Sequence, residues 1–499
     1  MSSMRRRSAL CAVYLGSFLA TLDISIVNVA LPTMQAALRT DIAGMQWVVN
    51  AYAICLAAFM LSAGPMADRH GHKRSWLAGV LLFTAGSALC GWAPSLAALL
   101  AGRAVQGVAA AFLICGAMPI LTHAFPDPKA RMHVIGGWSA FNALALMLGP
   151  LAGGLLLRDW GWQSIFLINL PIGALAIALG SLGIVECRYP DHAARDPWGQ
   201  GLSILALGAL TLGVIEAGVQ GWTARLPVVC MLVAVLAFLA FVRVERRVPR
   251  PLLPLRLLRE RAFAVANMAS FVLGFSYYTS LFFFSIFLQE IQGFSPAEAG
   301  WRLMPQFAAT LIMSFLFGRL SRGISLQWLT AAGYGLSGLA FLVMAGLGAH
   351  TPYLPVAMAF CLLGVGAGLA VPATSIAIMR LAPGEQAGAA SATMNALRQS
   401  GMTLGIALLG VLMSERAVGL FSRAARELGV AQADTVARAA ITEHVFPQQG
   451  AALQALFVPA LEGGFQLAML LAGLACLLAL GLLLRLPALQ PAQAAPPSA

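Results

Sequence analysis

Asp23 is a single carboxylate inside the long apolar run from Ser8 to Leu31. About twenty apolar residues in a helix cross a bilayer core of ~30 Å, so this run is expected to span a membrane. A charged side chain near the centre of a span costs about 2.5–3.5 kcal/mol even on the most lenient scale. We therefore expect Asp23 to face protein or water and to have a function, rather than only to pack helices together.

Arg103 could pair with this carboxylate. Pro32 is expected to close the first span and Ser95 to begin the fourth. Both side chains then lie about 12–13 Å below the same membrane face, at ~1.5 Å per residue. An arginine beside Asp23 would hold the carboxylate ionised, whereas burial would favour the neutral form, and a group balanced between the two can load and release a proton. The alternative is that Arg103 belongs to a structural ion pair.

A second arginine, Arg398, lies near the middle of the apolar run 387–413, with Asn395 and Gln399 beside it. A buried arginine at that depth needs an anion or a set of carbonyl groups. The run contains no acid of its own, and Glu415 follows its end. Arg398 could pair with an acid from another helix or bind an anionic substrate, and the sequence leaves both open.

The loop after the second apolar run reads GPMADRHGHKR over 64–74 and is expected to act as a cytoplasmic hinge. Gly64 would let its helix approach a neighbour closely. Asp68 could cap a helix start or pair with an arginine across the seam between bundles. His70 and His72 are expected to be solvated. The candidate gating residues of this loop are Gly64, Asp68, Arg69, Gly71, Lys73 and Arg74.

The run 134–157 holds a second group of candidate gating residues, Gly149, Pro150, Gly153 and Gly154. Proline removes a backbone donor, and glycines let another helix come close. We therefore expect the fifth span to be broken at this point.

The composition is that of a polytopic membrane protein, with 60% hydrophobic and only 10% charged residues among 499. A soluble domain carries about 25% charged residues. Loops on the side of the N-terminus hold roughly three basic residues for each one on the opposite side, which predicts that both termini are cytoplasmic. The net charge of +12 is thereby explained without nucleic acid. Fourteen spanning runs are expected, near 8–32, 46–64, 76–93, 96–123, 134–157, 163–185, 200–217, 226–243, 263–288, 298–318, 327–348, 353–379, 387–413 and 462–486.

Motifs for catalysis are missing from the sequence. It contains no GxxxxGK[ST] phosphate-binding loop, and its seven histidines form no HExxH pattern or other metal spacing. The eight cysteines form no CxxC pair and are expected to be small buried residues. We expect no enzyme activity, no metal and no cofactor.

Three segments lie outside the expected spans. The most basic loop, 243–261, could be an amphipathic interfacial helix, although a cytoplasmic linker that follows the positive-inside rule is the plainer interpretation. The segment 415–461, on the outside, is expected to contain a surface helix. The tail 487–499, rich in alanine, proline and glutamine, is expected to be disordered.

An internal repeat divides the chain. Four matching pairs recur at offsets of 254, 257, 257 and 253 residues, namely Gly64 with Gly318, Gly107 with Gly364, Pro126 with Pro383, and Asn142 with Asn395. A near-constant offset at matching positions indicates duplication. We predict a six-helix bundle over 1–185, an inserted helix pair with the basic loop over 186–262, and a second six-helix bundle over 263–486.

The ordered motifs resemble the major facilitator superfamily, in its fourteen-span drug:proton antiporter branch (the EmrB/QacA type). The matching stretches are LDISIVNVALP (22–32), WVVNAY (47–52), GPMADRHGHKR (64–74), LLAGRAVQGVAAA (99–111), LGPLAGG (148–154), WGWQSIFLINLPIG (160–173), FLQEIQGFSPAEAG (287–300), GVGAG (364–368) and GAASATMNALRQSGMTLG (388–405).

The resemblance implies two helical bundles that rock around a central cavity. It assigns proton coupling to Asp23 and proton handling to Arg103. It gives the 64–74 loop a role in stabilising one state, which only the first copy should play, because the second has Leu320-Ser321 in place of the acid. The GPxxGG pattern over 149–154 indicates export rather than import. Candidate cavity residues are Asn28, Asn50, Tyr52, Gln106, Asn142, Asn395, Arg398 and Gln399.

The hypothesis is a proton-coupled efflux transporter that exports amphipathic small molecules or drugs across the bacterial inner membrane by alternating access. A dedicated exporter of one metabolite, such as a siderophore or an anionic natural product, is the alternative, and Arg398 favours it. A membrane-embedded enzyme or receptor has no catalytic residues to support it. The expected partners are the substrate, protons and the lipid bilayer. We expect a monomer, and the sequence leaves open whether a periplasmic adaptor protein assists.

Overall fold

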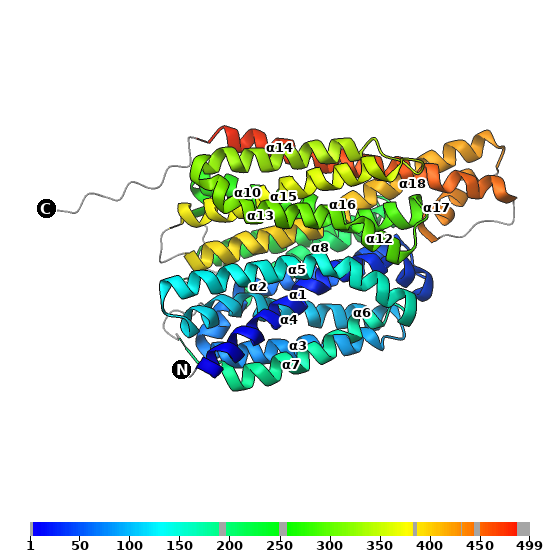
Figure 1. The fold of residues 1–499 in the computed structure, drawn as a ribbon. Coiled ribbons are helices and arrows are strands. Elements are labelled where there is room, and N and C mark those ends of the chain that lie inside the picture. Colours follow the sequence, from blue (N-terminus) through cyan, green and yellow to red (C-terminus); the bar gives the residue numbers. More distant parts are fainter. Residues whose placement is uncertain are drawn as a thin grey trace.

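The computed structural model describes residues 3–188, 196–248, 257–382, 387–430, 432–443 and 450–486. Regular structure throughout these ranges is helical, and they contain no strand. The long helices run side by side, and α1 begins at the same end of the molecule at which α18 ends (Figure 1). We call this the proximal end and the opposite one the distal end. The predicted all-α class is confirmed.

The first half, the blue-to-teal lobe of Figure 1, comprises α1 (Ser3–Leu38), α2 (Ile42–His70), α3 (His72–Gly91), α4 (Leu96–Ala124), α5 (Pro128–Trp160), α6 (Ser164–Leu167) and α7 (Asn169–Gly183). The helices α8 (Pro197–Gln220) and α9 (Arg225–Glu245) follow as a pair. The second half comprises η2 (Leu257–Arg259), α10 (Arg261–Leu273), η3 (Gly274–Tyr278), α11 (Thr279–Ile286), η4 (Phe287–Ile291), α12 (Pro296–Arg302), α13 (Met304–Gly323), α14 (Leu326–Met344), α15 (Tyr353–Leu381), α16 (Ala387–Glu427), α17 (Ala433–Glu443) and α18 (Gly450–Leu484).

Local sequence explains where several of these helices begin. The side chain of Asp41 accepts the backbone N–H of Gly44 at the start of α2, and Ser95 caps α4 in the same way. Such caps satisfy N–H groups that a helix leaves unpaired in its first turn. Between α2 and α3, Gly71 adopts a φ of 107°, a left-handed conformation that favours glycine. The chain can therefore reverse within one residue at the proximal end.

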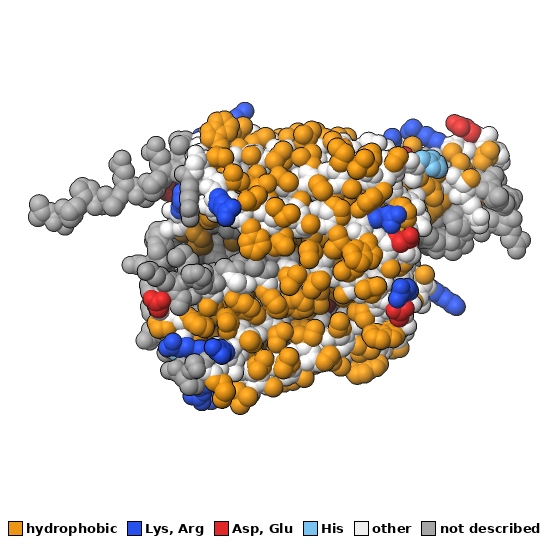
Figure 2. All heavy atoms as spheres, in the orientation of Figure 1, with side chains coloured by type: hydrophobic (Ala, Val, Ile, Leu, Met, Phe, Trp, Pro, Cys, Tyr) orange, Lys and Arg blue, Asp and Glu red, His pale blue; other side chains and the backbone are white. Residues whose placement is uncertain are grey.

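Twelve helical segments of the described ranges are long and apolar enough to cross a membrane. The helices α3 and α5, although 20 and 33 residues long, are not in this set. Figure 2 shows hydrophobic side chains over the middle of the visible face and charged side chains near its two ends. Apolar residues in contact with lipid and polar residues at the interfaces produce this pattern. The protein is a multi-pass membrane protein.

The internal repeat is visible in the helix contacts. A Cβ atom at Gly107 would lie 2.3 Å from the carbonyl oxygen of Tyr52, and one at Gly364 would lie 2.2 Å from that of Gln306. The two glycines are 257 residues apart and their partners 254 apart, as the motif offsets predict. Glycine allows these backbones to meet in both halves. The same close contact between helices therefore recurs in both halves at the offset of the predicted repeat.

The first and ninth predicted spans match by the same rule. A Cβ atom at Gly149 would lie 1.8 Å from Ser25 Oγ. In the second half, Thr279 Oγ1 donates a hydrogen bond of 3.1 Å to the carbonyl of Met402. Residues 25 and 279 are 254 apart, and residues 149 and 402 are 253 apart. Ser25 in α1 and Thr279 in α11 therefore lie at matching positions, and the same offset of 254 residues pairs Asp23 with Tyr277.

The two halves contact each other at their distal ends and are separated at the proximal end, near Gly64 and Gly318. A Cβ atom at Gly154 would lie 2.6 Å from the α12 backbone, and one at Gly300 would lie 2.3 Å from the carbonyl oxygen of Pro150. By contrast, Gly64 and Gly318 would have no atom within 4 Å of such a Cβ. The predicted close approach at Gly64 is therefore wrong for this conformation, in which the proximal seam is open.

Two expectations about proline are wrong. Pro32 does not close the first span, because α1 continues to Leu38, and Pro150 does not break α5, which runs on to Trp160. Proline is tolerated inside a membrane helix when neighbouring helices satisfy the freed carbonyl groups or pack the helix from both sides. α5 is packed in this way, between α1 and α12.

The inserted pair packs on the first half through α8. Ser62 in α2 donates a hydrogen bond to the side chain of Gln200, which itself donates to the carbonyl of Ala58 at 3.0 Å. The helix α9 lies outside and exposes apolar residues such as Leu232 and Phe238. Exposed leucine and phenylalanine on a membrane helix are suited to contact with lipid.

The other non-spanning segments have mixed outcomes. The predicted surface helix within 415–461 is confirmed, because α16 extends to Glu427 and α17 follows it. Asp434 in α17 accepts hydrogen bonds from Ser422 and Arg426, which lower the pKa of its carboxyl group. Residues 249–256 of the basic loop and the tail 487–499 lie outside the described residues.

Candidate functional site

Asp23 and Arg103 meet inside the first half, as the depth argument predicted. Arg103 Nη1 donates to Asp23 Oδ2 at 2.5 Å, joining α4 to α1. The exposed fractions of the two side chains are 1% and 0%. A fully buried carboxylate is stable only when a cation and further hydrogen bonds compensate its lost hydration.

Gln106 closes a small ring around this pair. Its Nε2 donates to Asp23 Oδ1 at 3.1 Å, while its Oε1 accepts from Arg103 Nη1 at 2.8 Å. The same Nε2 also donates to Ser87 Oγ at 2.8 Å, and Asn169 Nδ2 donates to that hydroxyl at 3.2 Å. Both carboxylate oxygens of Asp23 therefore have donors, and the network extends from α1 through α4 to α3 and α7.

Arg103 has partners besides the carboxylate. Its Nε donates to the carbonyl of Val48 at 3.0 Å, and the guanidinium carbon lies 4.5 Å above the ring centre of Tyr52. Tyr52 is itself held by a hydrogen bond of 3.2 Å to the carbonyl of Ala20. A cation over an aromatic face is stabilised by the ring quadrupole. These contacts would hold the guanidinium in place if Asp23 became neutral.

The sequence predicted that Asp23 faces protein or water, and the structure places it against protein. With no exposed surface, the carboxylate does not contact solvent in this conformation. The Arg103 guanidinium is its charged partner. Water can therefore reach Asp23 only if the surrounding helices rearrange.

The candidate cavity residues fall into two groups. Four are at least 97% buried, and of these Tyr52 and Gln106 belong to the charge network, while Asn28 and Asn50 lie on α1 and α2. The other four are half-buried and come from α5 and α16, namely Asn142, Asn395, Arg398 and Gln399. Asn142 Oδ1 accepts from Thr21 Oγ1 at 3.1 Å, and Asn395 Nδ2 donates to the carbonyl of Ser391 at 3.0 Å.

The proximal hinge is organised by partners that were not predicted. Asp68 does not pair with an arginine in the described structure but accepts from His72 Nε2 at 2.9 Å. His72 is 1% exposed, so its predicted solvation is wrong, whereas His70 is exposed. The reason is that the chain turns at Gly71 and α3 starts immediately, which brings His72 one helical turn from Asp68.

Glu186, just after α7, covers the start of α3. Its carboxylate accepts the backbone N–H groups of Lys73 at 3.0 Å and Arg74 at 3.3 Å. A negative group at a helix N-terminus is favoured by the helix dipole. Lys73 Nζ donates to the carbonyl of Ser181 at 2.6 Å, while the Arg69 and Arg74 side chains are exposed. Burial raises the pKa of the neighbouring Cys187 thiol, and the carboxylate of Glu186 raises it further.

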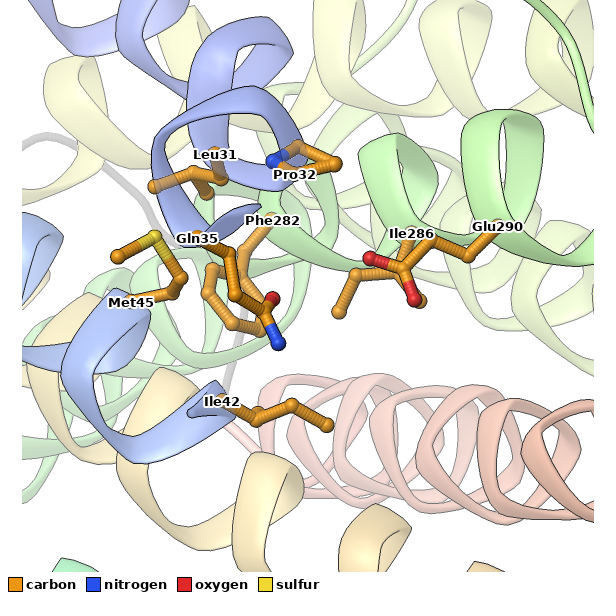
Figure 3. Close-up of a pocket in the computed structure, with 8 residues that line it drawn as sticks. All are labelled: Leu31, Pro32, Gln35, Ile42, Met45, Phe282, Ile286 and Glu290. Carbon is orange, nitrogen blue, oxygen red and sulfur yellow. The ribbon is translucent and has the colours of Figure 1, made fainter. Parts of the chain in front are cut away.

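At the distal seam, α1 and the ninth span are joined through two backbone carbonyls close to Pro32, of which that of Asn28 lacks a helical partner because proline has no N–H. Ser285 Oγ donates to the carbonyl of Asn28, four residues before the proline, and Gln289 Nε2 donates to that of Val29 at 3.0 Å. Both donors belong to the second half. Next to them a pocket of about 10 Å³, enough for roughly one water molecule, lies between Pro32 and Glu290 (Figure 3).

Several of these residues carry no signal that the sequence could have shown. Ser87 and Asn169 are small polar residues in apolar runs, where most such residues only bond their own helix. Glu186 acts on a helix more than one hundred residues earlier. Ser285 and Gln289 could have been predicted only by searching for side chains that donate hydrogen bonds to the backbone carbonyls close to Pro32.

The fold and the charge network define a class of membrane transporter. The profile of the Major Facilitator Superfamily matches residues 13–414. This chain therefore belongs to the Major Facilitator Superfamily.

Two relatives and one solved structure specify the similarity. The chain is 38% identical over 406 residues to the multidrug resistance protein Stp of Mycobacterium tuberculosis, covering 81% of this chain and 75% of that protein. It is 35% identical over 402 residues to the methylenomycin A resistance protein of Streptomyces coelicolor, covering 81% and 84%. The crystal structure of a bacterial homologue of the human lysosomal transporter Spinster matches with a TM-score of 0.64 and 21% identity, over 97% of this chain and 99% of that one, which shows the shared fold.

Proposed function

We infer that this chain exports amphipathic small molecules, drugs among them, in exchange for protons. Membership of the superfamily supports transport, and the names of the two relatives, which refer to multidrug and methylenomycin A resistance, support drug efflux. The observation that carries the proton coupling is the buried Asp23–Arg103 pair on two helices of spanning length. Ionisable residues inside membrane spans commonly form ion or proton pathways.

The proposed cycle alternates between two conformations, one with the distal seam closed and one with it open. With the distal seam closed, as here, Asp23 is ionised and paired with Arg103, and substrate enters from the proximal side. Opening of the distal seam releases the substrate and admits a proton to Asp23. The neutral carboxyl group releases Arg103, which stays on the Val48 carbonyl and the Tyr52 ring. Return to the closed distal seam lets Asp23 lose its proton to the proximal side and restores the pair.

The proposal also sets the topology. We place fourteen spans in the membrane, adding α3 and α5 to the twelve, because α3 packs against α4, and α5 against α1. This count agrees with the EmrB/QacA branch and with six-helix bundles over 1–185 and 263–486, joined by the inserted pair. We place the proximal end in the cytoplasm, the protein in the bacterial inner membrane, and the active unit as a monomer.

The alternative is a dedicated exporter of one metabolite. One relative is named for a single antibiotic and the other for several drugs. The names therefore favour neither a multidrug exporter nor an exporter of a single compound. The observation on the side of the alternative is Arg398, a half-buried arginine that would favour an anionic compound.

The test uses purified protein in sealed liposomes loaded with ethidium, with a proton gradient imposed across the membrane. The wild-type protein should drive gradient-dependent ethidium transport that a protonophore abolishes. Asp23→Asn, which keeps the size of the side chain but cannot ionise, should reduce this transport to the level of empty liposomes.

Asp159→Asn is the matched control, because Asp159 is an exposed carboxylate whose ion pair, in the part of the chain that the structure describes, is with its neighbour Arg158. This variant should transport like the wild type. Gradient-driven transport by Asp23→Asn at the wild-type rate would contradict the role of Asp23, and transport that ignores the gradient would contradict proton coupling.

A further inference from the structure

Arg398 has donors that point at no protein acceptor. Its Nε and Nη2 atoms are buried and have no hydrogen-bond partner within the described part of the chain. The side chain as a whole is half-buried, so part of it reaches open space. Buried donors without partners are uncommon in native structures, and for a charged group the penalty is larger than for a neutral one.

The position of Arg398 along α16 places it well inside the membrane. It lies eleven residues after the start of this helix, or roughly 16 Å at ~1.5 Å per residue. Farther along, at the distal seam, a Cβ atom at Gly410 would collide with the side chain of Gln46 in the first half. Arg398 is about 18 Å to the proximal side of that closure, by the same helical rise. It therefore lies on the side where the two halves stand apart.

Aromatic rings of the ninth span border the same place. A Cβ atom at Gly274 would lie 1.8 Å from the carbonyl oxygen of Arg398, so η3 and α16 are in backbone contact there. Phe271 and Phe275, on either side of Gly274, stack with ring centres 6.3 Å apart and an angle of 19°. Both rings are half-buried, unlike Phe282, Phe283 and Phe284 in the core. They offer a flat apolar surface on the segment whose backbone contacts that of Arg398.

Two acids of the second half, both on helices of spanning length, have other partners. Glu415, seventeen residues farther along α16, accepts from the indole of Trp222, and Glu462 accepts the backbone N–H of Ala349. No ion pair in the described residues includes Arg398. The prediction that Arg398 pairs with an acid from another helix therefore finds no support.

The helix itself does not require an arginine at this point. With the offset of 253 residues, the counterpart of Arg398 in α5 is Ala145, which is fully buried. The first half thus builds the equivalent helix with a small apolar residue. Because Arg398 and Ala145 differ, a packing role shared by the two helices does not explain the arginine. A ligand bound only in the second half explains it better.

We propose that Arg398 binds the carboxylate or another oxyanion group of the exported molecule, whose flat apolar part lies on Phe271 and Phe275. A guanidinium can donate two parallel hydrogen bonds to such a group, and Nε with Nη2 is one of the pairs of donors with the required geometry. The depth of the residue excludes a lipid headgroup in its usual place. This inference rests on the proposed export function and adds flat amphipathic acids to the amphipathic molecules that the protein would carry.

The experiment compares two probes of equal shape, 2-naphthoate and 2-naphthamide, that differ in charge at neutral pH. Their dissociation constants are measured by isothermal titration calorimetry on the full-length protein in lipid nanodiscs. We expect the wild type to bind the carboxylate at least tenfold more tightly than the amide. Arg398→Gln should bind both equally, and Arg398→Lys, which keeps the charge but loses the planar fork, should show an intermediate ratio.

Arg416→Gln, an exposed site on the same helix, is the matched control and should keep the wild-type ratio. Equal binding of the two probes by the wild type, no binding of either, or a tenfold preference that survives in Arg398→Gln would each overturn the proposal. Gradient-driven ethidium transport by the same wild-type preparation separates the two claims. If this transport is present while the preference is missing, the export function stands and the anion site fails.

Discussion

In the first half, position 23 is an aspartate bonded to Arg103, whereas the counterparts of these residues in the second half are Tyr277 and Phe360. Tyr277 shares a neutral hydrogen bond of 3.4 Å with Thr310, and the Phe360 ring lies 4.7 Å from that of Phe284. Both halves place these side chains in the same framework of close helix contacts. One half fills the space with an ion pair and the other with aromatic rings.

This difference separates what the fold needs from what transport needs. Aromatic side chains fill the second site without desolvating any charge, so the framework is stable with an apolar centre. The ion pair in the first half is therefore better explained by function than by packing. Conversely, the second half keeps Arg398 where the first has Ala145, so each half carries one charged feature that its counterpart lacks.

The largest expected effect comes from removing one member of the ion pair. Arg103→Gln leaves the Asp23 carboxylate buried without its cation, which should destabilise the protein by about 3–5 kcal/mol. The double variant Asp23→Asn/Arg103→Gln removes both charges and should recover most of that loss, while gradient-driven transport stays at background. Thermal unfolding in detergent and ethidium transport in liposomes measure the two quantities.

Tyr277→Phe provides the control from the second half. It removes one hydroxyl group and its hydrogen bond to Thr310, so a loss of about 0.5–1.5 kcal/mol with transport retained is expected. A double variant that is less stable than Arg103→Gln alone would show that the pair is structural. The comparison between the halves would then lose its functional meaning.

A second prediction concerns the framework that the halves share. Gly107→Ala and Gly364→Ala each place a Cβ atom within 2.3 Å of a backbone oxygen on a neighbouring helix. Both should destabilise the protein by similar amounts, about 1–3 kcal/mol, because the helices must move apart. Gly208→Ala in α8, where a Cβ would meet nothing within 4 Å, should leave the unfolding temperature near that of the wild type. Strongly unequal effects at Gly107 and Gly364 would argue against equivalent roles.

The sequence predicted the parts of this site that depend on helical rise alone. Asp23 and Arg103 were placed at one depth by counting residues, because every turn of a helix rises by a fixed amount. The network beyond them depends on how α3 and α7 rotate about their axes. No residue count reveals that Gln106 and Asn169 both donate to the Ser87 hydroxyl.

The errors share one physical cause. Whether Pro32 ends a helix depends in part on a residue about 250 positions later, because Ser285 donates to the Asn28 carbonyl, which the proline leaves without its helical N–H. The surroundings of His72 likewise depend on a distant segment, because its backbone N–H donates to the carbonyl of Cys187 at 3.0 Å. The sequence around a residue does not reveal such distant partners. They matter most at the seam between the two halves.

The smallest expected effect lies at that seam, where the two halves meet. Ser285→Ala with Gln289→Ala removes the donors that join the second half to the Asn28 and Val29 carbonyls. Each hydrogen bond contributes about 0.5–1.5 kcal/mol, so the closed distal seam should become several-fold less populated. We expect faster maleimide labelling of Gln35→Cys, whose side chain lines the distal pocket of Figure 3, as measured by mass spectrometry at that position.

Ser280→Ala is the matched control, because its hydroxyl bonds to the carbonyl of Tyr277 in its own span and does not cross the seam. Labelling of Gln35→Cys should be unchanged in this variant. If the double variant labels no faster than the control, the Asn28 and Val29 carbonyls do not hold the halves together. The distal closure would then depend on the packing of α5 on α12 and of α2 on α16, and α1 and the ninth span would be neighbours without being coupled.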